Sequence, residues 1–143
     1  MLNNTKANIT VIDTFKGSPE MVEVGVQMDG IKQRFIENIK PWKSRVTILE
    51  GYSQDVLRTI GKQFSFIYVD GSHYAGDALR DIVYSWKLLK QNGIMIMDDY
   101  VWGDFEDNVP VTRMAIEAFL MCFQGEYRGL AKNAQCVVKK IKA

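Results

Sequence analysis

The sequence predicts an α/β fold with a mostly parallel sheet, and three observations lead to this prediction. Short apolar runs alternate along the chain with segments that repeat apolar residues at helical spacing. Three of these runs end at acidic residues, namely Asp13, Asp70 and Asp98–Asp99. No repeat, low-complexity tract or linker interrupts the 143 residues, a length that suits one domain. We therefore predict a single three-layer αβα domain over residues 1–143.

Four apolar or β-branched runs are predicted to be strands of the parallel sheet: Asn8–Ile12, Arg45–Leu49, Phe64–Val69 and Ile94–Met97. The third run is apolar nearly throughout, which predicts that helices cover both of its faces. Phe66 and Tyr68 of this run, and Trp86 further along, are accordingly assigned to core packing. After Gly125, the segments Tyr127–Leu130 and Gln135–Val138 are predicted to pair as a terminal hairpin.

Helical spacing predicts a helix between each pair of strands. One carries Ile31, Phe35, Ile36 and Ile39 and must stop before Pro41. A short helix capped by Ser53 carries Val56, Leu57 and Ile60. A longer one carries apolar residues from Ala78 to Leu89 and ends at Asn92–Gly93 through a left-handed residue. Pro110 suits the first turn of a last helix that reaches Cys122.

Charge and composition exclude several classes of protein. The net charge of +1, with acids and bases interspersed, leaves no broad positive field for nucleic acid. No apolar stretch is long enough to span a membrane, and the first residues do not resemble a signal peptide. Cys122 and Cys136 are too few for a disulfide framework and are predicted to be buried thiols in a reducing compartment. These observations predict a cytoplasmic protein.

The acids at the strand ends are the first candidates for a site. Parallel strands place their carboxyl ends at one edge of the sheet, where ligands bind in α/β proteins. Asp13 suits the hydroxyls of a ribose. Asp70, Asp98 and Asp99 suit a divalent cation such as Mg²⁺, which could lower the pKa of a substrate hydroxyl. In the alternative interpretation, Asp98 only caps its turn and Asp99 alone faces the pocket.

His73 is the only histidine of the chain, so it is a candidate proton acceptor; as an alternative, it caps the helix that starts near Tyr74. Four aromatic residues follow strand ends and are candidates for an adenine or substrate pocket: Phe15, Tyr52, Tyr100 and Trp102. Exposed aromatic residues also occur in loops without any function, and both interpretations stay open.

The residues of the third and fourth strands resemble a known family. Tyr68-Val69-Asp70-Gly71-Ser72-His73, followed by Asp81, Gly93 and Asp98-Asp99-Tyr100, is similar to class I S-adenosylmethionine-dependent methyltransferases. The likeness is to the small-molecule O-methyltransferase group, in particular to macrocin O-methyltransferase-like enzymes. It implies a Rossmann-like fold and methyl transfer to a hydroxyl of a small molecule or sugar.

The resemblance also implies roles for individual residues. The cofactor S-adenosylmethionine would contact Asp13, Phe15, the Gly51-Tyr52-Ser53 turn and Asp70, with Asp13 on the ribose and the turn beside the adenine. Asp70, Asp98 and Asp99 would hold magnesium. His73 and Asp70 would be catalytic, and Tyr100 and Trp102 would contact the substrate.

The sequence departs from the family at two places. Ala75 stands where a tyrosine usually follows the histidine by two residues. The first central strand and its glycine-rich turn, which cradles the cofactor's methionine part, have no counterpart before Asn8. Either the sheet closes up around the missing strand, or another chain fills the gap, because an open edge invites pairing. We expect a truncated or decayed methyltransferase that folds as a homodimer, with exchange of a strand as one route.

Two other functions compete with methyl transfer. The first is a non-catalytic domain, either a ligand-binding remnant or a subunit that needs a partner chain to complete its cofactor site. The second is metal-dependent phosphate chemistry at the same acids. This second alternative ranks last, because the chain has no phosphate-binding glycine loop with a lysine.

Overall fold

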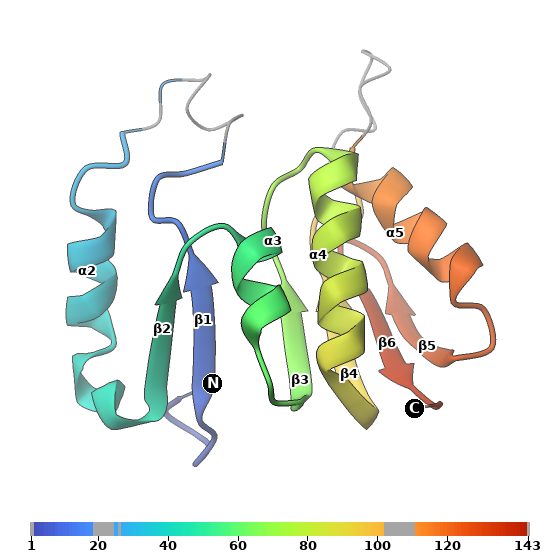
Figure 1. The fold of residues 1–143 in the computed structure, drawn as a ribbon, viewed down its shortest axis with the longest axis horizontal. Helices are drawn as coiled ribbons and strands as arrows, with labels where there is room; N and C mark the ends of the chain where they lie inside the picture. The colour runs from blue at the N-terminus through green and yellow to red at the C-terminus, as the bar shows by residue number, and fades with distance from the viewer. Residues whose placement is uncertain (1, 19–24, 26, 102–110, 143) are drawn as a thin grey trace. The chain divides into compact units, whose positions relative to one another are not determined.

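The computed structural model describes residues 2–18, 25, 27–101 and 111–142 (Figure 1). Within it the chain forms two compact units, Met1–Val56 and Leu57–Ala143, which are described separately below. The prediction of a single domain over residues 1–143 stays a prediction. In the part of the chain that the structure describes, no helix is both long and apolar enough to cross a membrane.

The first unit is built on two parallel strands, β1 (Ile9–Asp13) and β2 (Val46–Glu50). Their register pairs Ile9 with Val46 and Asp13 with Glu50, so two carboxylates finish neighbouring strands. Between the strands, α2 (Ile31–Asn38) is followed by a 3₁₀ helix, η1 (Lys40–Arg45). The prediction that the helix stops before Pro41 is confirmed, and the proline occupies the first turn of η1, where its missing N–H costs nothing.

The second unit contains a four-stranded mixed sheet in the order β3-β4-β6-β5. Its strands are β3 (Phe64–Val69), β4 (Leu89–Met97), β5 (Tyr127–Lys132) and β6 (Cys136–Lys140). β3 and β4 run parallel, while β6 is antiparallel to both β4 and β5. The predicted terminal hairpin is therefore confirmed, and it closes the sheet on the side of β4.

Two helices, α4 (Ala75–Leu88) and α5 (Thr112–Cys122), pack together over one face of this sheet (Figure 1). The core lies between them and β4 and β6. Its fully buried side chains are Ile82, Leu89, Met95, Met97, Ile116, Phe119 and Val138. Burial of one such side chain contributes about 1.5–3 kcal/mol, so this layer supplies most of the driving force for folding of the unit. Trp86 is also buried, as predicted, with its ring 5.2 Å from that of Phe119.

Several predicted element boundaries were wrong. Ser53 is the first residue of α3 (Ser53–Val56) rather than its cap, and Leu57–Thr59 form a separate 3₁₀ helix, η2. Helix α4 ends at Leu88, because Leu89 already pairs with Phe64 across the sheet. Asn92 is left-handed as expected, with φ 64°, but it lies within β4 instead of ending the helix. Pro110 lies outside the described residues.

Two expectations about burial were also wrong. β3 is not covered on both faces, because Phe66 is 37% exposed and Tyr68 is 45% exposed. The side chains of these two residues alternate with Ile67 and Val69, which pack against the core. Both cysteines are free, but Cys122 is exposed and only Cys136 is buried.

The described strands belong to two sheets, one in each unit. The described strands form a two-stranded sheet, β1-β2, and the separate four-stranded sheet. The two alternatives for the missing strand, a sheet that closes up or a gap filled by another chain, stay predictions. β1 and β3 each remain at the edge of their own sheet.

A buried lysine anchors the end of α4 to the sheet. Lys140 on β6 is 6% exposed, and its Nζ donates to the carbonyl oxygens of Trp86 at 2.9 Å and Leu89 at 3.1 Å. These carbonyls lie in the last turn of the helix and just beyond it, and the Trp86 carbonyl also accepts the Leu89 N–H. The ammonium also lies 5.0 Å from the centre of the Trp86 ring. Burial lowers the pKa of this lysine.

Replacement of Lys140 by methionine is expected to destabilise the protein by about 2 kcal/mol, because two carbonyl oxygens lose their hydrogen bonds to the buried ammonium. Urea unfolding followed by tryptophan fluorescence measures the loss. The exposed Lys142, replaced in the same way, serves as the control and should change the free energy of unfolding by less than about 0.5 kcal/mol. Equal stability of the two variants would contradict the anchoring role.

Candidate functional site

The acidic ends of β3 and β4 lie side by side. The parallel register pairs Val69 with Met97, so Asp70 and Asp98 each follow the last residue of a strand. The Asp98 N–H donates to the Val69 carbonyl at 3.0 Å, which continues the ladder by one residue. The prediction that Asp70, Asp98 and Asp99 share one edge of the sheet therefore holds within the second unit.

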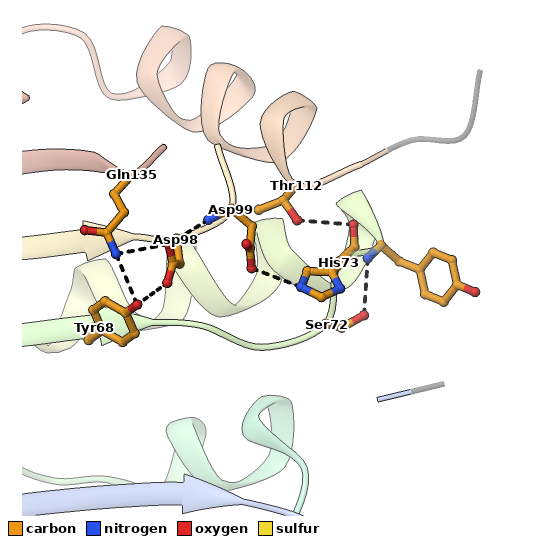
Figure 2. A network of polar contacts seen from close by, with 8 residues as sticks. Tyr68, Ser72, His73, Asp98, Asp99, Thr112 and Gln135 are labelled. Atoms are coloured by element: carbon orange, nitrogen blue, oxygen red, sulfur yellow. Dashed lines mark hydrogen bonds and ion pairs between the residues drawn. The ribbon is translucent and has the colours of Figure 1, made fainter. Parts of the chain in front are cut away.

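Asp98 is held by three donors (Figure 2). Its Oδ2 accepts from the Tyr68 hydroxyl, and its Oδ1 accepts from Gln135 Nε2 and from the Asp99 N–H, both at 3.0 Å. Burial alone would raise the pKa of Asp98, but these hydrogen bonds outweigh it and lower the pKa. The same hydrogen bond raises the pKa of Tyr68 to about 12, with burial and the nearby carboxylates adding to the effect. Asp98 is therefore an ionised and oriented carboxylate.

Asp99 points away from Asp98 and toward His73. His73 Nε2 lies 2.9 Å from Asp99 Oδ2, with side-chain exposures of 15% for the histidine and 30% for the aspartate (Figure 2). The histidine is also held through its backbone, because Thr112 Oγ1 donates to its carbonyl oxygen at 3.3 Å. In the tautomer with hydrogen on Nε2, the imidazole donates to the carboxylate. The two side chains form a hydrogen-bonded pair in which the aspartate is the more accessible member.

Asp70 is exposed, unlike the half-buried Asp98 and Asp99, and yet its pKa is raised. Burial raises its pKa, and the charges of Asp98 and Asp99 raise it further, while His73 opposes them. Next to it, Gly71 approaches α4 closely, since a Cβ at this position would lie 3.1 Å from Asp81 Oδ2. A cavity of about 10 Å³ lies among the Asp70–His73 turn, the start of α4 and the Asp98–Asp99 segment, which is enough for about one water molecule.

The acids supply the oxygen donors that Mg²⁺ prefers, but their arrangement does not fit the ion. Among residues 2–18, 25, 27–101 and 111–142, no group of three or more His, Cys, Asp or Glu side chains is placed to hold a metal. The reason lies in the hydrogen bonds, because Asp98 faces Tyr68 and Gln135 whereas Asp99 faces His73. Mg²⁺ binding would require at least one of these carboxylates to turn.

Of the two predicted substrate residues, Tyr100 lies within the described residues and Trp102 does not. Tyr100 is 8% exposed, and its hydroxyl donates to Glu117 of α5. Its ring lies between two cations, with Arg113 Cζ at 5.2 Å and Lys132 Nζ at 5.0 Å from the centroid. Lys132 completes the group with an ion pair to Glu117 at 2.6 Å, and these contacts lower the pKa of Glu117. Trp102 lies outside the described residues, and the substrate role of both stays a prediction.

The predicted cofactor residues other than Asp70 belong to the first unit. Asp13 ends β1 and is exposed; its Oδ1 accepts from the Phe15 N–H at 2.7 Å, and its carbonyl accepts from the Gly51 N–H at 3.0 Å. Gly51 has φ 153°, and a Cβ there would lie 3.0 Å from Val56 Cγ2, so the tight turn after β2 favours glycine. Tyr52 is 60% exposed. Asp13 and the turn from Gly51 to Ser53 are thus neighbours at the ends of β1 and β2.

Sequence reasoning missed Tyr68 and Gln135 as parts of the site. Tyr68 was assigned to the core because its run is apolar, although its phenol could have been expected to seek a polar partner at a strand end. Gln135 gave no local signal. It reaches Asp98 only because the antiparallel register pairs Met97 with Cys136, which brings the start of β6 beside the end of β4.

Comparison with known proteins decides the family. The family model for the methyltransferase domain matches residues 1–100, more than half of the chain. The chain belongs to the methyltransferase domain family. The O-methyltransferase hkm8 of Aspergillus hancockii is 24% identical over 139 residues, which cover 89% of this chain and 51% of the relative. The methyltransferase chain described here thus spans about half the length of the curated relative it matches.

Solved structures confirm the predicted methyltransferase fold. The O-methyltransferase NovP superposes with a TM-score of 0.68 at 17% identity, covering 99% of this chain and 63% of its own. TomG from Streptomyces achromogenes, determined in complex with SAM, gives 0.65 at 13% identity, covering 95% and 62%. An O-methyltransferase from Bacillus cereus in complex with SAH gives 0.65 at 15% identity, covering 96% and 64%.

Replacement of Asp70 by asparagine is expected to stabilise the protein at pH 7. The folded-state pKa of Asp70 is raised, so its stabilising contribution is complete below the unfolded pKa of about 3.9 and is lost as the pH rises through the folded pKa. Asparagine stays neutral at every pH. The variant should therefore be more stable than the wild type above the folded pKa of Asp70 and equally stable below the unfolded pKa. Urea unfolding from pH 3 to pH 8 in metal-free buffer measures this difference, with the exposed Asp29 replaced by asparagine as the control. A gain that does not depend on pH would contradict it.

Proposed function

We propose that this chain is the core of an S-adenosylmethionine-dependent methyltransferase that modifies a hydroxyl of a small molecule or sugar. The observation that carries the proposal is the His73–Asp99 pair at the end of the parallel strands β3 and β4, in a chain of the methyltransferase family. S-Adenosylmethionine, when bound, supplies an electrophilic methyl group. The chain's own residues must then bind the cofactor, orient the acceptor and receive its proton.

Asp13 and the Gly51-Tyr52-Ser53 turn are proposed to bind the nucleoside part of the cofactor. A carboxylate at the end of a parallel strand accepts hydrogen bonds from ribose hydroxyls, and Asp13 is exposed at such an end. Tyr52 is the most exposed aromatic side chain among those predicted for the cofactor, so its ring is available to an adenine. Phe15 lies 5.4 Å from the Phe35 ring and stiffens the turn that presents Asp13.

The hydroxyl proton of the acceptor is proposed to move to Asp99. Asp99 is twice as exposed as His73, so it is the member of the pair that an acceptor meets first. His73, with hydrogen on Nε2, donates to the carboxylate and keeps it oriented to accept the proton. Tyr100 and Trp102 remain candidates for contact with the acceptor.

Magnesium on Asp70, Asp98 and Asp99 stays a prediction from the sequence. The carboxylates have the right chemistry for the ion, and the raised pKa of Asp70 reflects their mutual repulsion after the effect of burial. The proton transfer proposed above does not involve magnesium, because it runs between the acceptor hydroxyl and the His73–Asp99 pair.

Calorimetric titration of the purified chain tests the proposal. S-Adenosylmethionine and SAH are expected to bind, and Asp13→Asn should weaken both about 10- to 100-fold by loss of charged hydrogen bonds to the ribose. Asparagine retains an acceptor oxygen for the Phe15 N–H, so the turn itself should persist. Asp29→Asn is the control. A separate titration with MgCl₂, in the wild type and in Asp99→Asn, reports whether the acids bind the ion.

A non-catalytic remnant is the second candidate function. The chain spans 51% of the curated relative and 63% of NovP, so these relatives contain parts that have no counterpart in it. Absence of heat with either S-adenosylmethionine or SAH would support the remnant and contradict the enzyme. Binding that appears only after addition of a second polypeptide would support the subunit form of this alternative.

A cytoplasmic homodimer is part of the proposal. β3 is the outer strand of its sheet, and Phe66 on it is 37% exposed. A parallel strand with a free edge and exposed apolar side chains pairs readily with another chain, either by addition or by exchange of a strand. Two free thiols agree with a reducing compartment.

Light scattering coupled to size exclusion is expected to give twice the monomer mass. Phe66→Lys should shift the chain toward the monomer, since a lysine on an edge strand opposes pairing. Met121→Lys on α5 is the matched control, because Met121 is 76% exposed on a helix. If the wild type is a monomer over a wide range of concentrations, the proposed homodimer is wrong.

A further inference from the structure

Tyr68, Gln135 and Asp98 form a closed polar triangle beside the proposed proton acceptor. Tyr68 donates to Asp98 Oδ2, while Gln135 Nε2 donates to Asp98 Oδ1 at 3.0 Å and to the Tyr68 hydroxyl at 3.2 Å (Figure 2). The three residues come from β3, from the start of β6 and from the end of β4. Both donors are neutral, so the carboxylate keeps its charge while its orientation is fixed from two directions.

Asp99 has a backbone conformation that needs such support. Its φ of 55° is left-handed, a region that costs a non-glycine residue free energy and that persists only where the surroundings impose it. The fixed carboxylate supplies one such constraint, because Asp98 Oδ1 accepts the Asp99 N–H at 3.0 Å. The neighbouring amides supply the others, with Asp98 N–H on the Val69 carbonyl and Tyr100 N–H on the Ala134 carbonyl.

The direction of the Asp99 side chain depends on this conformation. In an extended strand, successive side chains point to opposite faces, and continued strand geometry at position 99 would change the direction of its carboxylate. The left-handed residue instead turns the chain and brings Oδ2 to 2.9 Å from His73 Nε2. Any group that fixes Asp98 therefore also fixes the His73–Asp99 pair.

We propose that Tyr68 and Gln135 are positioning residues that act through Asp98 to hold Asp99 against His73. The inference deepens the proposed function, since it concerns the same proton-accepting pair. It also assigns a role to two side chains that lie 30 and 37 residues away from Asp98 in the sequence. Because Tyr68 is 45% exposed, the triangle contributes little to the free energy of unfolding, and its removal changes geometry more than stability.

The only histidine of the chain provides a direct readout. A long-range ¹H–¹⁵N spectrum of the imidazole at one fixed pH, without cofactor or metal, reports the hydrogen bond at Nε2. Asp99→Asn defines the signal of the broken pair. Tyr68→Phe and Gln135→Met should each move the Nε2 resonance in the same direction by a smaller amount, and the double variant should move it further. Tyr84→Phe and Gln91→Met are the matched controls and should leave it unchanged.

Each outcome bears on the proposal. Thermal unfolding and far-UV circular dichroism confirm that the variants are folded, and Gln135→Met tests the triangle by itself if Tyr68→Phe unfolds. Wild-type resonances in the double variant would overturn the positioning role. An unchanged spectrum in Asp99→Asn would overturn the pair and the positioning role together. Neither result depends on binding of S-adenosylmethionine, which tests the methyltransferase function separately by calorimetry.

Discussion

The second unit depends on one constraint, the mutual repulsion of three carboxylates at the ends of two adjacent parallel strands. Parallel pairing of β3 with β4 brings Asp70, Asp98 and Asp99 to one edge, and each needs a different solution. The charge of Asp98 is stabilised by hydrogen bonds from Tyr68 and Gln135, and Asp99 is held by contact with His73. At Asp70, the effect of His73 is too weak to prevent a raised pKa. The parallel pairing of β3 with β4 thus explains why hydrogen-bond donors are needed around these acids.

The terminal hairpin connects the acidic edge of the sheet to the hydrophobic core. Its strand β6 pairs with β4, which places Gln135 beside Asp98 at one end and Lys140 beside the last turn of α4 at the other. The same helix begins just after His73, whose carbonyl is held by Thr112 of α5. The acidic edge and the hydrophobic core are consequently fixed by the same two helices and one strand.

Much of this unit was predictable from sequence. Apolar periodicity located β3, α4 and the terminal hairpin, because those signals are local, and the acids after Val69 and Met97 marked the site. The partners of those acids were not predictable, since Tyr68 and Gln135 reach Asp98 through the tertiary register. The exposure of Phe66 and Tyr68 was missed for a similar reason, as an apolar run does not reveal whether a second layer covers it. The end of α4 was misplaced because the pairing of Leu89 with Phe64 competed with the helix.

The left-handed backbone at Asp99 limits which residues can replace it. Glycine, asparagine and aspartate adopt this conformation most easily, whereas β-branched side chains resist it. The chemistry of a carboxylate and the shape of the turn therefore select residues independently at one position. A lineage that lost the carboxylate while keeping the fold would be confined largely to asparagine or glycine here. The residue at position 99 in related chains would then reveal loss of proton transfer long before loss of the fold.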